Sequence, residues 1–389
     1  MRSVCLSMIG VVWVVSPWAF ATEGPAGQGF PDKEILVGVN YFAGWWEPLP
    51  NKWHGHGWTV HEPDWRCENP QRDPLLGIYN DQATMDREIV AAAGYGVDFF
   101  AILWYFPAPE SKHREDCKWL NRGVENFQRS PEARRMRFFV EYCNHDLSAA
   151  RTDAEWEQCL ATWLAAMRHP SYLRVGGRLV FKVHDSSGFF RQNGQDVECC
   201  RARLKRLRAA AREAGLGEIL IGGGLMARSE VKPGSVVARL YDFTATYMSI
   251  PAVEVVDSEQ PYALLAQEAS EARARHAADP IPWVPYLAAG WNPRPWTHPK
   301  ADENHRRFFA FPTRDQWADE LRRMRDDLGR CPGLGLPLAD GRRQKVFTIY
   351  AWNEFGEGGI VAPTRADRYM KLDAVREVFG GNGDPPSGR

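Results

Sequence analysis

The stretch that decides the fold is VFTIYAWNEFGEGG, residues 346–359 of the 389-residue chain. Its first half is a continuous apolar run, which is typical of a strand buried on both faces. An indole, an amide and two carboxylates follow at once, at Trp352, Asn353, Glu354 and Glu357. If the chain turns helically here, the two carboxylates lie about 5–6 Å apart. Such a pair just past a buried strand indicates an enzyme site that works with two carboxyl groups.

Short apolar runs of the same kind recur through the chain. The eight predicted strands are Ile35–Tyr41, Val97–Tyr105, Arg137–Cys143, Arg178–His184, Glu218–Gly222, Tyr241–Tyr247, Ile281–Leu287 and Val346–Trp352. Helical patterns between and after them cover Gln82–Ala93, Asp153–Arg168, Asp196–Gly215, a segment that begins at the capping box of Thr313 and Gln316, and Asp367–Phe379. Eight strands alternating with helices predict the α/β class and a (β/α)8 TIM barrel in a single domain. An open doubly wound sheet is the alternative, but the count of eight and the lack of a Gly-rich phosphate loop argue against it.

The two ends of the sequence predict a cleaved signal peptide and a disordered C-terminal tail. Arg2 precedes the apolar stretch Val4–Val15, and Ala19-Phe-Ala21 supplies a small-x-small cleavage pattern. Residues 1–21 are therefore predicted to be a signal peptide of a secreted or periplasmic protein. A membrane helix is the alternative, although the stretch falls short of the roughly 20 apolar residues that a span needs. Residues 22–379 form the predicted catalytic domain, and the Gly- and Pro-rich residues 380–389 a disordered tail.

Composition narrows the class of partner. The formal net charge of −1 gives no support to a nucleic-acid partner. No segment after the first predicts stable membrane insertion. We expect a monomer, with an oligosaccharide or polysaccharide as its substrate. The aromatic load is heavy, with 16 Trp, 12 Tyr and 19 Phe, which suits stacking on sugar rings. Seven cysteines remain after removal of the signal peptide, and Cys67 and Cys117 are a candidate disulfide. No CxxC or zinc-like spacing is present and His54, His56 and His61 lack a carboxylate at ligand spacing, so we predict no metal, no cofactor and cleavage without a metal.

A TIM barrel places its active site at the carboxyl ends of its strands. The candidate substrate-binding residues at or just beyond those ends are Tyr41, Trp45, Trp46, Trp104, Tyr105, Glu141, Asn144, Tyr247, Tyr286, Trp291 and Asn353. Alternatively, Tyr41, Trp104 and Tyr105 only pack at the top of the barrel, and Glu141 only holds other side chains in place. Basic residues are scarce at these ends, which favours a neutral or mildly anionic sugar over a phosphorylated substrate. We expect Glu354 and Glu357 to open into one cleft with Trp45 or Trp46 on its wall.

The motif Trp352-Asn-Glu-Phe-Gly-Glu-Gly358 resembles the W-N-E-W-x-E-G motif of glycoside hydrolase family 99 endo-α-mannosidases. It also resembles a broader bacterial group of family 99-like barrels, some of which are labelled glycosyltransferases of polysaccharide biosynthesis. The segments Val37–Trp46, Gly94–Phe100 and Tyr286–Trp291 resemble other parts of that group. The chain departs from the mannosidase pattern at Gly356, where the family has histidine, and at Gly359–Pro363, where it has a polar run.

The resemblance implies a retaining endo-glycosidase that acts on α-linked glycans through a 1,2-anhydro sugar. Glu354 would be the base that acts on the sugar 2-hydroxyl, and Glu357 the acid and then the base. These roles require a raised pKa at Glu357 and an ionised Glu354. One alternative is a glycosyltransferase, but no D-x-D or basic cradle for a nucleotide sugar is present. Another is a non-catalytic carbohydrate-binding barrel, whose signature would be the loss of one carboxylate.

Overall fold

The computed structural model describes residues 33–55, 63–111, 114–226, 228–256, 258–296 and 303–380. From Lys33 onward the chain forms one compact unit. The predicted signal peptide, residues 1–21, lies outside the described residues, as do residues 381–389 of the predicted tail. Both therefore stay predictions.

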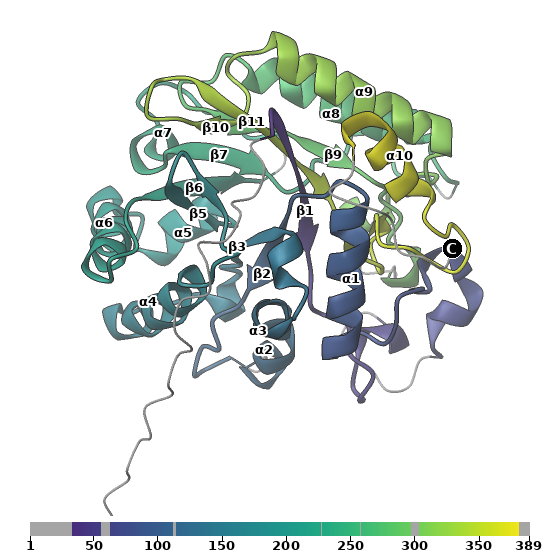
Figure 1. The fold of residues 1–389 in the computed structure, drawn as a ribbon, viewed down its shortest axis with the longest axis horizontal. Helices are drawn as coiled ribbons and strands as arrows, with labels where there is room; N and C mark the ends of the chain where they lie inside the picture. Colours follow the sequence, from purple (N-terminus) through teal and green to yellow (C-terminus); the bar gives the residue numbers. More distant parts are fainter. Residues whose placement is uncertain are drawn as a thin grey trace, which may run out of the picture. The chain divides into compact units, whose positions relative to one another are not determined.

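Parallel strands form a closed ring in the described part of the chain (Figure 1). In ring order they are β1 (Ile35–Tyr41), β2 (Phe99–Trp104), β3 (Arg137–Tyr142), β5 (Arg178–Val183), β6 (Ile219–Leu225), β7 (Phe243–Thr246), β8 (Trp283–Val284) with β9 (Tyr286–Ala288), and β11 (Arg343–Tyr350). β8 pairs with β7, β9 pairs with β11, and β11 pairs with β1, which closes the sheet. Pro285, which has no N–H, separates β8 from β9, so the two together act as one barrel strand. The predicted (β/α)8 barrel is confirmed, and the open doubly wound sheet is excluded.

Each of the eight predicted strands overlaps an observed strand. One difference is in β6, which continues past Gly222 through Gly223 and Gly224 to Leu225. A Cβ at Gly224 would lie 1.7 Å from the backbone oxygen of His184. The glycines therefore mark a close approach of neighbouring strands and not the end of a strand. Short antiparallel additions are β4 (Arg174–Val175) beside β5 and β10 (Leu336–Pro337) beside β11.

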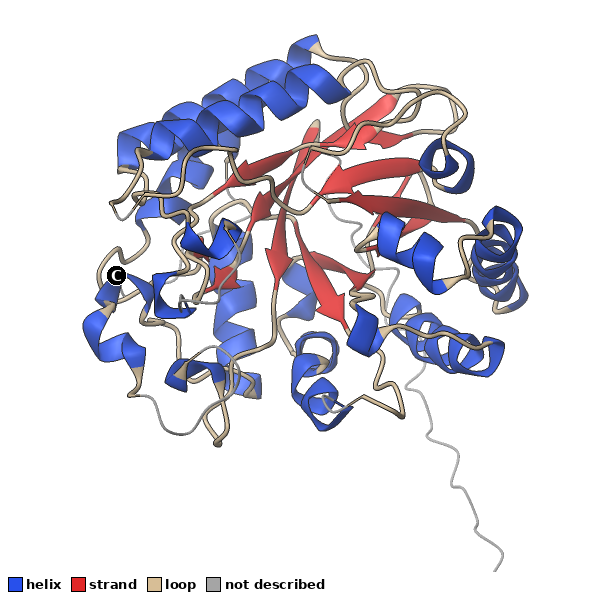
Figure 2. Ribbon diagram, turned by 180° about the vertical axis from the view of Figure 1, so that it is seen from behind, coloured by secondary structure: helices blue, strands red, loops and turns tan. Residues whose placement is uncertain are grey.

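Helices surround the strands (Figure 2). They are α1 (Gln82–Gly94), α2 (Arg114–Leu120), α3 (Arg122–Arg129), α4 (Asp153–Met167), α5 (Ser186–Gln192), α6 (Val197–Glu213), α7 (Val236–Leu240), α8 (Tyr262–His276), α9 (Arg314–Arg330) and α10 (Met370–Phe379). The five predicted helices correspond to α1, α4, α6, α9 and α10, and the predicted capping box of Thr313 and Gln316 is present at α9. No helix in these described segments combines the length and hydropathy that a membrane crossing requires.

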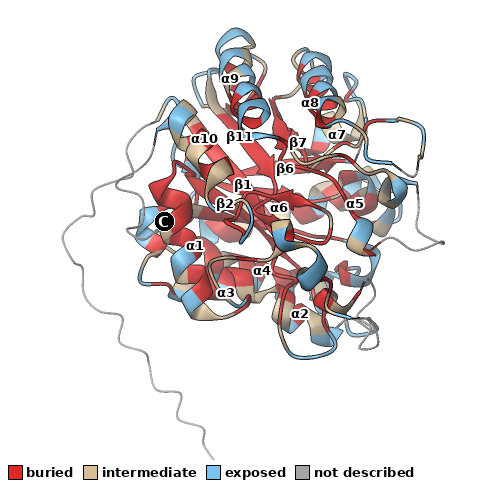
Figure 3. Ribbon diagram, turned by 90° about the vertical axis from the view of Figure 1, so that its right-hand side faces the viewer, coloured by how far each residue is buried: buried red, intermediate tan, exposed pale blue. Residues whose placement is uncertain are grey.

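The strands are buried, and the helices are buried on the side that faces them (Figure 3). Aromatic side chains fill much of this interface, as at Trp163 of α4, whose ring centroid lies 4.7 Å from that of Phe181 in β5. Burial of such rings provides both apolar area and favourable edge contacts. Cys200 is a fully buried core residue of α6. Cys67 is exposed and Cys117 is buried, and neither is bonded to another cysteine, so the candidate disulfide is wrong.

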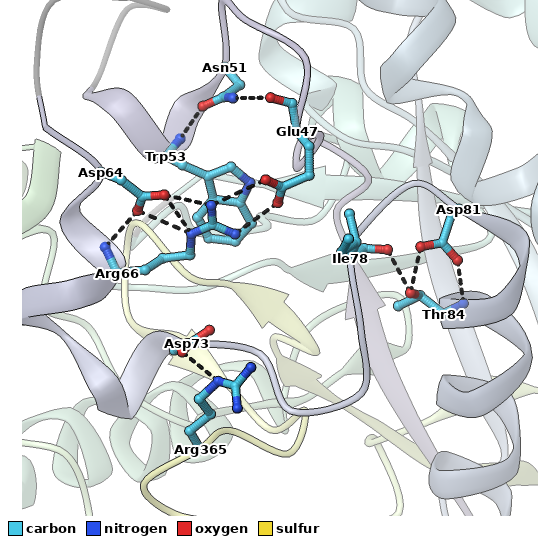
Figure 4. A network of polar contacts seen from close by, with 10 residues as sticks. All are labelled: Glu47, Asn51, Trp53, Asp64, Arg66, Asp73, Ile78, Asp81, Thr84 and Arg365. Carbon is cyan, nitrogen blue, oxygen red and sulfur yellow. Dashed lines mark hydrogen bonds and ion pairs between the residues drawn. The ribbon is translucent and has the colours of Figure 1, made fainter.

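Polar contacts fix the long loop between β1 and α1 (Figure 4). The Arg66 guanidinium donates to Glu47 at 2.8 Å and to Asp64 at 2.5 Å. Asn51 donates to the Glu47 carbonyl and accepts from the Trp53 amide at 3.0 Å. Further along, Arg365 forms an ion pair with Asp73 at 2.7 Å. These contacts give the described part of the loop a defined course.

Candidate active site

A cavity of about 950 Å³ opens at the carboxyl ends of the barrel strands. Each strand position contributes a lining residue at its last position or just beyond it: Phe42, Tyr105, Cys143, His184, Leu225, Tyr247, Trp291 and Tyr350. Both Glu354 and Glu357 also line it. Glu354 and Glu357 therefore open into one cavity at this end of the barrel, as expected. The volume lies at the upper end of the range usual for ligand pockets.

The sequence suggested that the two glutamates begin a helical turn. In the structure they belong to a hairpin instead. β12 (Asn353–Glu354) pairs antiparallel with β13 (Gly359–Ile360), and residues 355–358 form the turn. The amides of Glu357 and Gly358 both donate to the Glu354 carbonyl, at 3.2 and 2.8 Å. The turn therefore still brings side chains three residues apart to the same cavity. Asn353 holds the base of the hairpin in place, because the Asn353 side-chain oxygen accepts a hydrogen bond from the Phe42 amide at 2.8 Å.

Glu354 is 6% exposed and accepts a hydrogen bond from the Tyr247 hydroxyl at 2.9 Å. Burial and, after it, the Glu357 carboxylate raise the pKa of Glu354 to about 8, against the opposing effects of the Lys52 ammonium and the Tyr247 hydroxyl. The family roles had implied an ionised Glu354, so this direction differs from the expectation. The physical reason is that the base of the hairpin is deeply buried and holds two carboxyl groups close together.

Lys52 is the cation of the site. It belongs to a short 3-10 helix, Lys52–His54, in the β1–α1 loop. Its ammonium lies 4.6 Å from the ring centroid of Trp296 and 4.8 Å from that of Phe42. Burial lowers the pKa of Lys52, whereas Glu354 and Glu357 oppose this effect. Lys52 is therefore an electrostatic partner of the glutamates, and no sequence pattern indicated it.

Two buried groups hold Glu357 and the turn. The Tyr350 hydroxyl donates to the Glu357 carboxylate. Arg72, which is 1% exposed, donates to the carbonyls of Phe355 at 2.9 Å and of Asn292 at 2.5 Å. Since Asn292 also donates its amide to the Glu357 carbonyl at 2.6 Å, the loop after β9 and the glutamate turn are tied together. These contacts predict a site of fixed geometry.

Trp45 and Trp46 do not line the cavity, contrary to the prediction. Trp45 is fully buried behind it, where its indole N–H donates to the Asn353 carbonyl at 2.6 Å. Its ring stacks on that of Trp296 with centroids 5.6 Å apart. Trp46 stacks on Trp119 at 5.7 Å, away from the glutamates. Trp296, like Trp291, is a loop tryptophan that lines the cavity, and Trp45 stacks on it from behind.

Gly356, which stands where the family has histidine, lies directly against Trp296. A Cβ at this position would lie 2.1 Å from two atoms of that indole. The ring therefore occupies the space that a side chain at residue 356 would need. The glycine and the tryptophan together determine the shape of this part of the wall.

We expect Gly356→Ala to displace the Trp296 indole, because both cannot occupy the same space. The expected loss of unfolding free energy is about 1–3 kcal/mol, the usual range for overpacking a tight site. Chemical unfolding with tryptophan fluorescence measures both effects. Gly329→Ala is the matched control, since a Cβ at that α9 position meets no atom within 4 Å. An alanine at 356 as stable as the wild type would contradict this packing.

The structure places only some of the predicted substrate-binding residues on the cavity wall. Tyr105, Tyr247 and Trp291 line the cavity. Tyr41 and Trp104 face the helices instead: the Tyr41 hydroxyl donates to Glu88 of α1 at 2.7 Å, and the Trp104 ring lies 5.5 Å from that of Trp163. The reason is strand alternation, because Phe42 and Tyr105 are the next residues along and point the other way.

The remaining predicted residues are buried supports behind the cavity. Asn144 joins the ends of β3 and β5 through two hydrogen bonds of 2.9 Å with the Asp185 backbone. Tyr286 is fully buried, and its hydroxyl reaches the Ser249 carbonyl at 3.5 Å. Glu141 is fully buried and bonds Lys182 at 2.8 Å and His184 Nδ1 at 2.6 Å. Burial alone would raise its pKa, but Lys182 and His184 lower the pKa of Glu141 to about 2. The tether alternative for Glu141 is thus the one that the structure favours.

Sequence reasoning missed several residues of the cavity wall. Besides Lys52, Trp296 and Tyr350, these include Cys143, His145 and His184, which lie together on one side. Their positions at the ends of predicted strands were the available signal. His56 and His61 of the weighed histidine set lie outside the described residues.

Fold and site together define a (β/α)8 barrel with a glutamate pair in the cavity at its carboxyl end. Two solved structures are similar to it in fold. One is a glycoside hydrolase-like protein, with 13% identity, 91% of this chain and 97% of that chain covered, and a TM-score of 0.55. The other is a GH99 endo-alpha-mannosidase from Bacteroides thetaiotaomicron, with 12% identity, coverages of 90% and 96%, and a TM-score of 0.53. The sequence matches no protein-family model and no curated protein.

Proposed function

We propose that this protein is a retaining, endo-acting glycoside hydrolase that cleaves α-linked glycans or polysaccharide. The observation that carries the proposal is the pair Glu354 and Glu357, joined by one turn and lining one cavity of about 950 Å³. Two carboxyl groups that flank a glycosidic bond suffice for its hydrolysis. The neighbours of similar fold are glycoside hydrolases, which supports the same class. The signal-like residues 1–21 support action outside the cytoplasm.

The division of labour follows the motif resemblance. Glu357 donates a proton to the leaving oxygen, and Glu354 accepts the proton of the sugar 2-hydroxyl. The pKa of Glu354 is raised to about 8, so the ionised form that this role requires grows as the pH rises. The Lys52 ammonium supports that ionised form electrostatically. Trp291, Trp296 and Tyr105 supply aromatic surfaces for sugar rings.

Incubation with a panel of α-linked glycans, including mannans, tests the proposal through the appearance of new reducing ends. The Glu354→Gln/Glu357→Gln double variant should release none while remaining folded. Binding of a glycan without cleavage by the wild type would favour the carbohydrate-binding alternative. Transfer of sugar only from an added nucleotide-sugar donor would favour the glycosyltransferase alternative.

Tyr247→Phe is expected to move the pH dependence of cleavage. The variant removes the hydroxyl that donates to Glu354 at 2.9 Å. Because that bond favours the ionised carboxylate, its loss raises the pKa of Glu354 further. A rate that needs ionised Glu354 rises with pH through this pKa, so the rising limb of kcat/KM should move up by about one pH unit, which is equivalent to about 1.4 kcal/mol.

Tyr262→Phe is the control, because its hydroxyl donates to the Ala288 carbonyl outside the cavity. Its rising limb should match that of the wild type. If instead kcat/KM of the wild type falls through pH 8, and that falling limb moves in Tyr247→Phe, Glu354 acts as the proton donor and the two roles are reversed.

A further inference from the structure

A cysteine and two histidines converge on one side of the cavity. Cys143 follows β3, His184 follows β5, and His145 lies two residues beyond Cys143. β3 and β5 are parallel neighbours, so their carboxyl ends lie side by side. One ligand atom of each residue lies within 4.8 Å of those of the other two. Sequence spacing gave no sign of this group, because pairing of the two strands brings its third member in.

Glu141 fixes the orientation of His184. Its carboxylate, paired with Lys182 at 2.8 Å, lies 2.6 Å from His184 Nδ1. An imidazole that donates Nδ1–H to a carboxylate presents the lone pair of Nε2 on its other side. Metal-bound histidines nearly always have such a partner, which sets the tautomer and the ring orientation. Glu141 and His184 are both buried, so this orientation is held by the core of the barrel.

We propose that Cys143, His145 and His184 bind a Zn²⁺ ion at the cavity wall. One sulfur and two imidazole nitrogens form a ligand set that zinc prefers, whereas Mg²⁺ and Ca²⁺ prefer oxygen. Tetrahedral zinc holds such atoms roughly 3.4–3.6 Å apart. His145 is exposed, so movement of its ring can close the remaining distance. Cys143 loses its thiol proton to solvent when the ion binds, and the fourth position faces the cavity.

The ion would lie beside the glutamate pair. The His184 ring centroid is 5.0 Å from that of Tyr247, whose hydroxyl donates to Glu354. The positive charge of Lys182 is neutralised by its ion pair with Glu141. Cleavage by two glutamates needs no metal, so zinc here acts on the cavity and not on the bond-breaking step. It occupies wall surface and adds positive charge, and it therefore competes with glycan binding.

Cobalt(II) titration of the chelator-treated full-length protein tests the site without recourse to activity. We expect one equivalent of Co²⁺ to give the intense ligand-field bands of tetrahedral coordination and a thiolate-to-cobalt charge-transfer band. Zn²⁺ should abolish these bands by displacement. Cys143→Ser should remove the charge-transfer band, and His145→Ala should weaken binding about tenfold or more. His145 is exposed, so its replacement keeps the test valid if Cys143→Ser does not fold.

Cys67→Ser and Cys199→Ser are the matched controls, since these sulfurs are more accessible and lie away from the cavity. Both should titrate like the wild type. A charge-transfer band that survives in Cys143→Ser but disappears in either control would show adventitious surface binding and overturn the proposal. Absence of the tetrahedral spectrum in the wild type would also overturn it. If glycan cleavage is established, Zn²⁺ should lower it less in His145→Ala than in the wild type, each relative to its own zinc-free rate.

Discussion

Replacing Glu357 with glutamine is expected to lower cleavage of a natural glycosidic bond by about 10²–10⁴-fold, the usual contribution of a general acid. The amide keeps the shape of the carboxyl group and its contact with the Tyr350 hydroxyl, but it has no proton to give to the leaving oxygen. The loss should appear in kcat/KM on the glycan that the wild type cleaves. On a glycosyl fluoride, whose leaving group needs no proton, the loss should be much smaller.

Glu354→Gln provides the contrast, because the role of Glu354 does not depend on the leaving group. This variant should stay inactive on both substrates. Glu377→Gln on the exposed side of α10 is the control for a change of charge away from the cavity and should leave both rates near those of the wild type. Equal losses for Glu357→Gln and Glu354→Gln on the fluoride would overturn the assignment of roles.

Glu141→Gln should destabilise the barrel by about 3–5 kcal/mol, the cost of leaving a buried charge without its partner. Lys182 is 4% exposed at its side chain and pairs with Glu141 at 2.8 Å. Glu141 and Lys182 are paired in register across the adjacent strands β3 and β5. Glutamine keeps the volume but cannot neutralise the ammonium. Urea unfolding followed by circular dichroism measures the difference.

The matched control is Glu115→Gln, whose pair with Lys118 is exposed. Removal of an exposed pair typically changes stability by about 0–1 kcal/mol. A loss for Glu141→Gln as small as this would contradict the structural role of the buried pair. The lowered pKa of Glu141 also contributes stability that is complete above its ordinary value of 4.5 and is lost as the pH falls through about 2. This acid-dependent part should be missing in the variant.

Local pattern was enough to predict the barrel and the position of its site. Buried strands have continuous apolar runs, and the alternation of strands with helices leaves few possible topologies. The run from Val346 to Tyr350 forms the last part of β11, and Glu354 and Glu357 follow within one hairpin. Residues so close in sequence cannot separate far in space, so their shared cavity was predictable.

Tertiary packing alone decided which other residues reach that cavity. Leu103, Trp104 and Tyr105 are adjacent apolar residues, and only the phase of the strand directs Trp104 to α4 and its neighbours to the cavity. Long loops follow no periodicity at all, so nothing local distinguished Trp296, which lines the cavity, from Trp45, which stacks on it from behind.

Charge and chemistry at the site were decided in the same way. Lys52 meets the glutamates because a loop folds over the barrel end, and Cys143 meets His184 because β3 pairs with β5. The pKa of Glu354 depends on burial and on both neighbours together. Sequence by itself determined the fold, the end of the barrel and the two carboxylates, since these depend on short-range pattern. The tertiary structure decided their ionisation and the wall around them, since these depend on contacts between segments far apart in the chain.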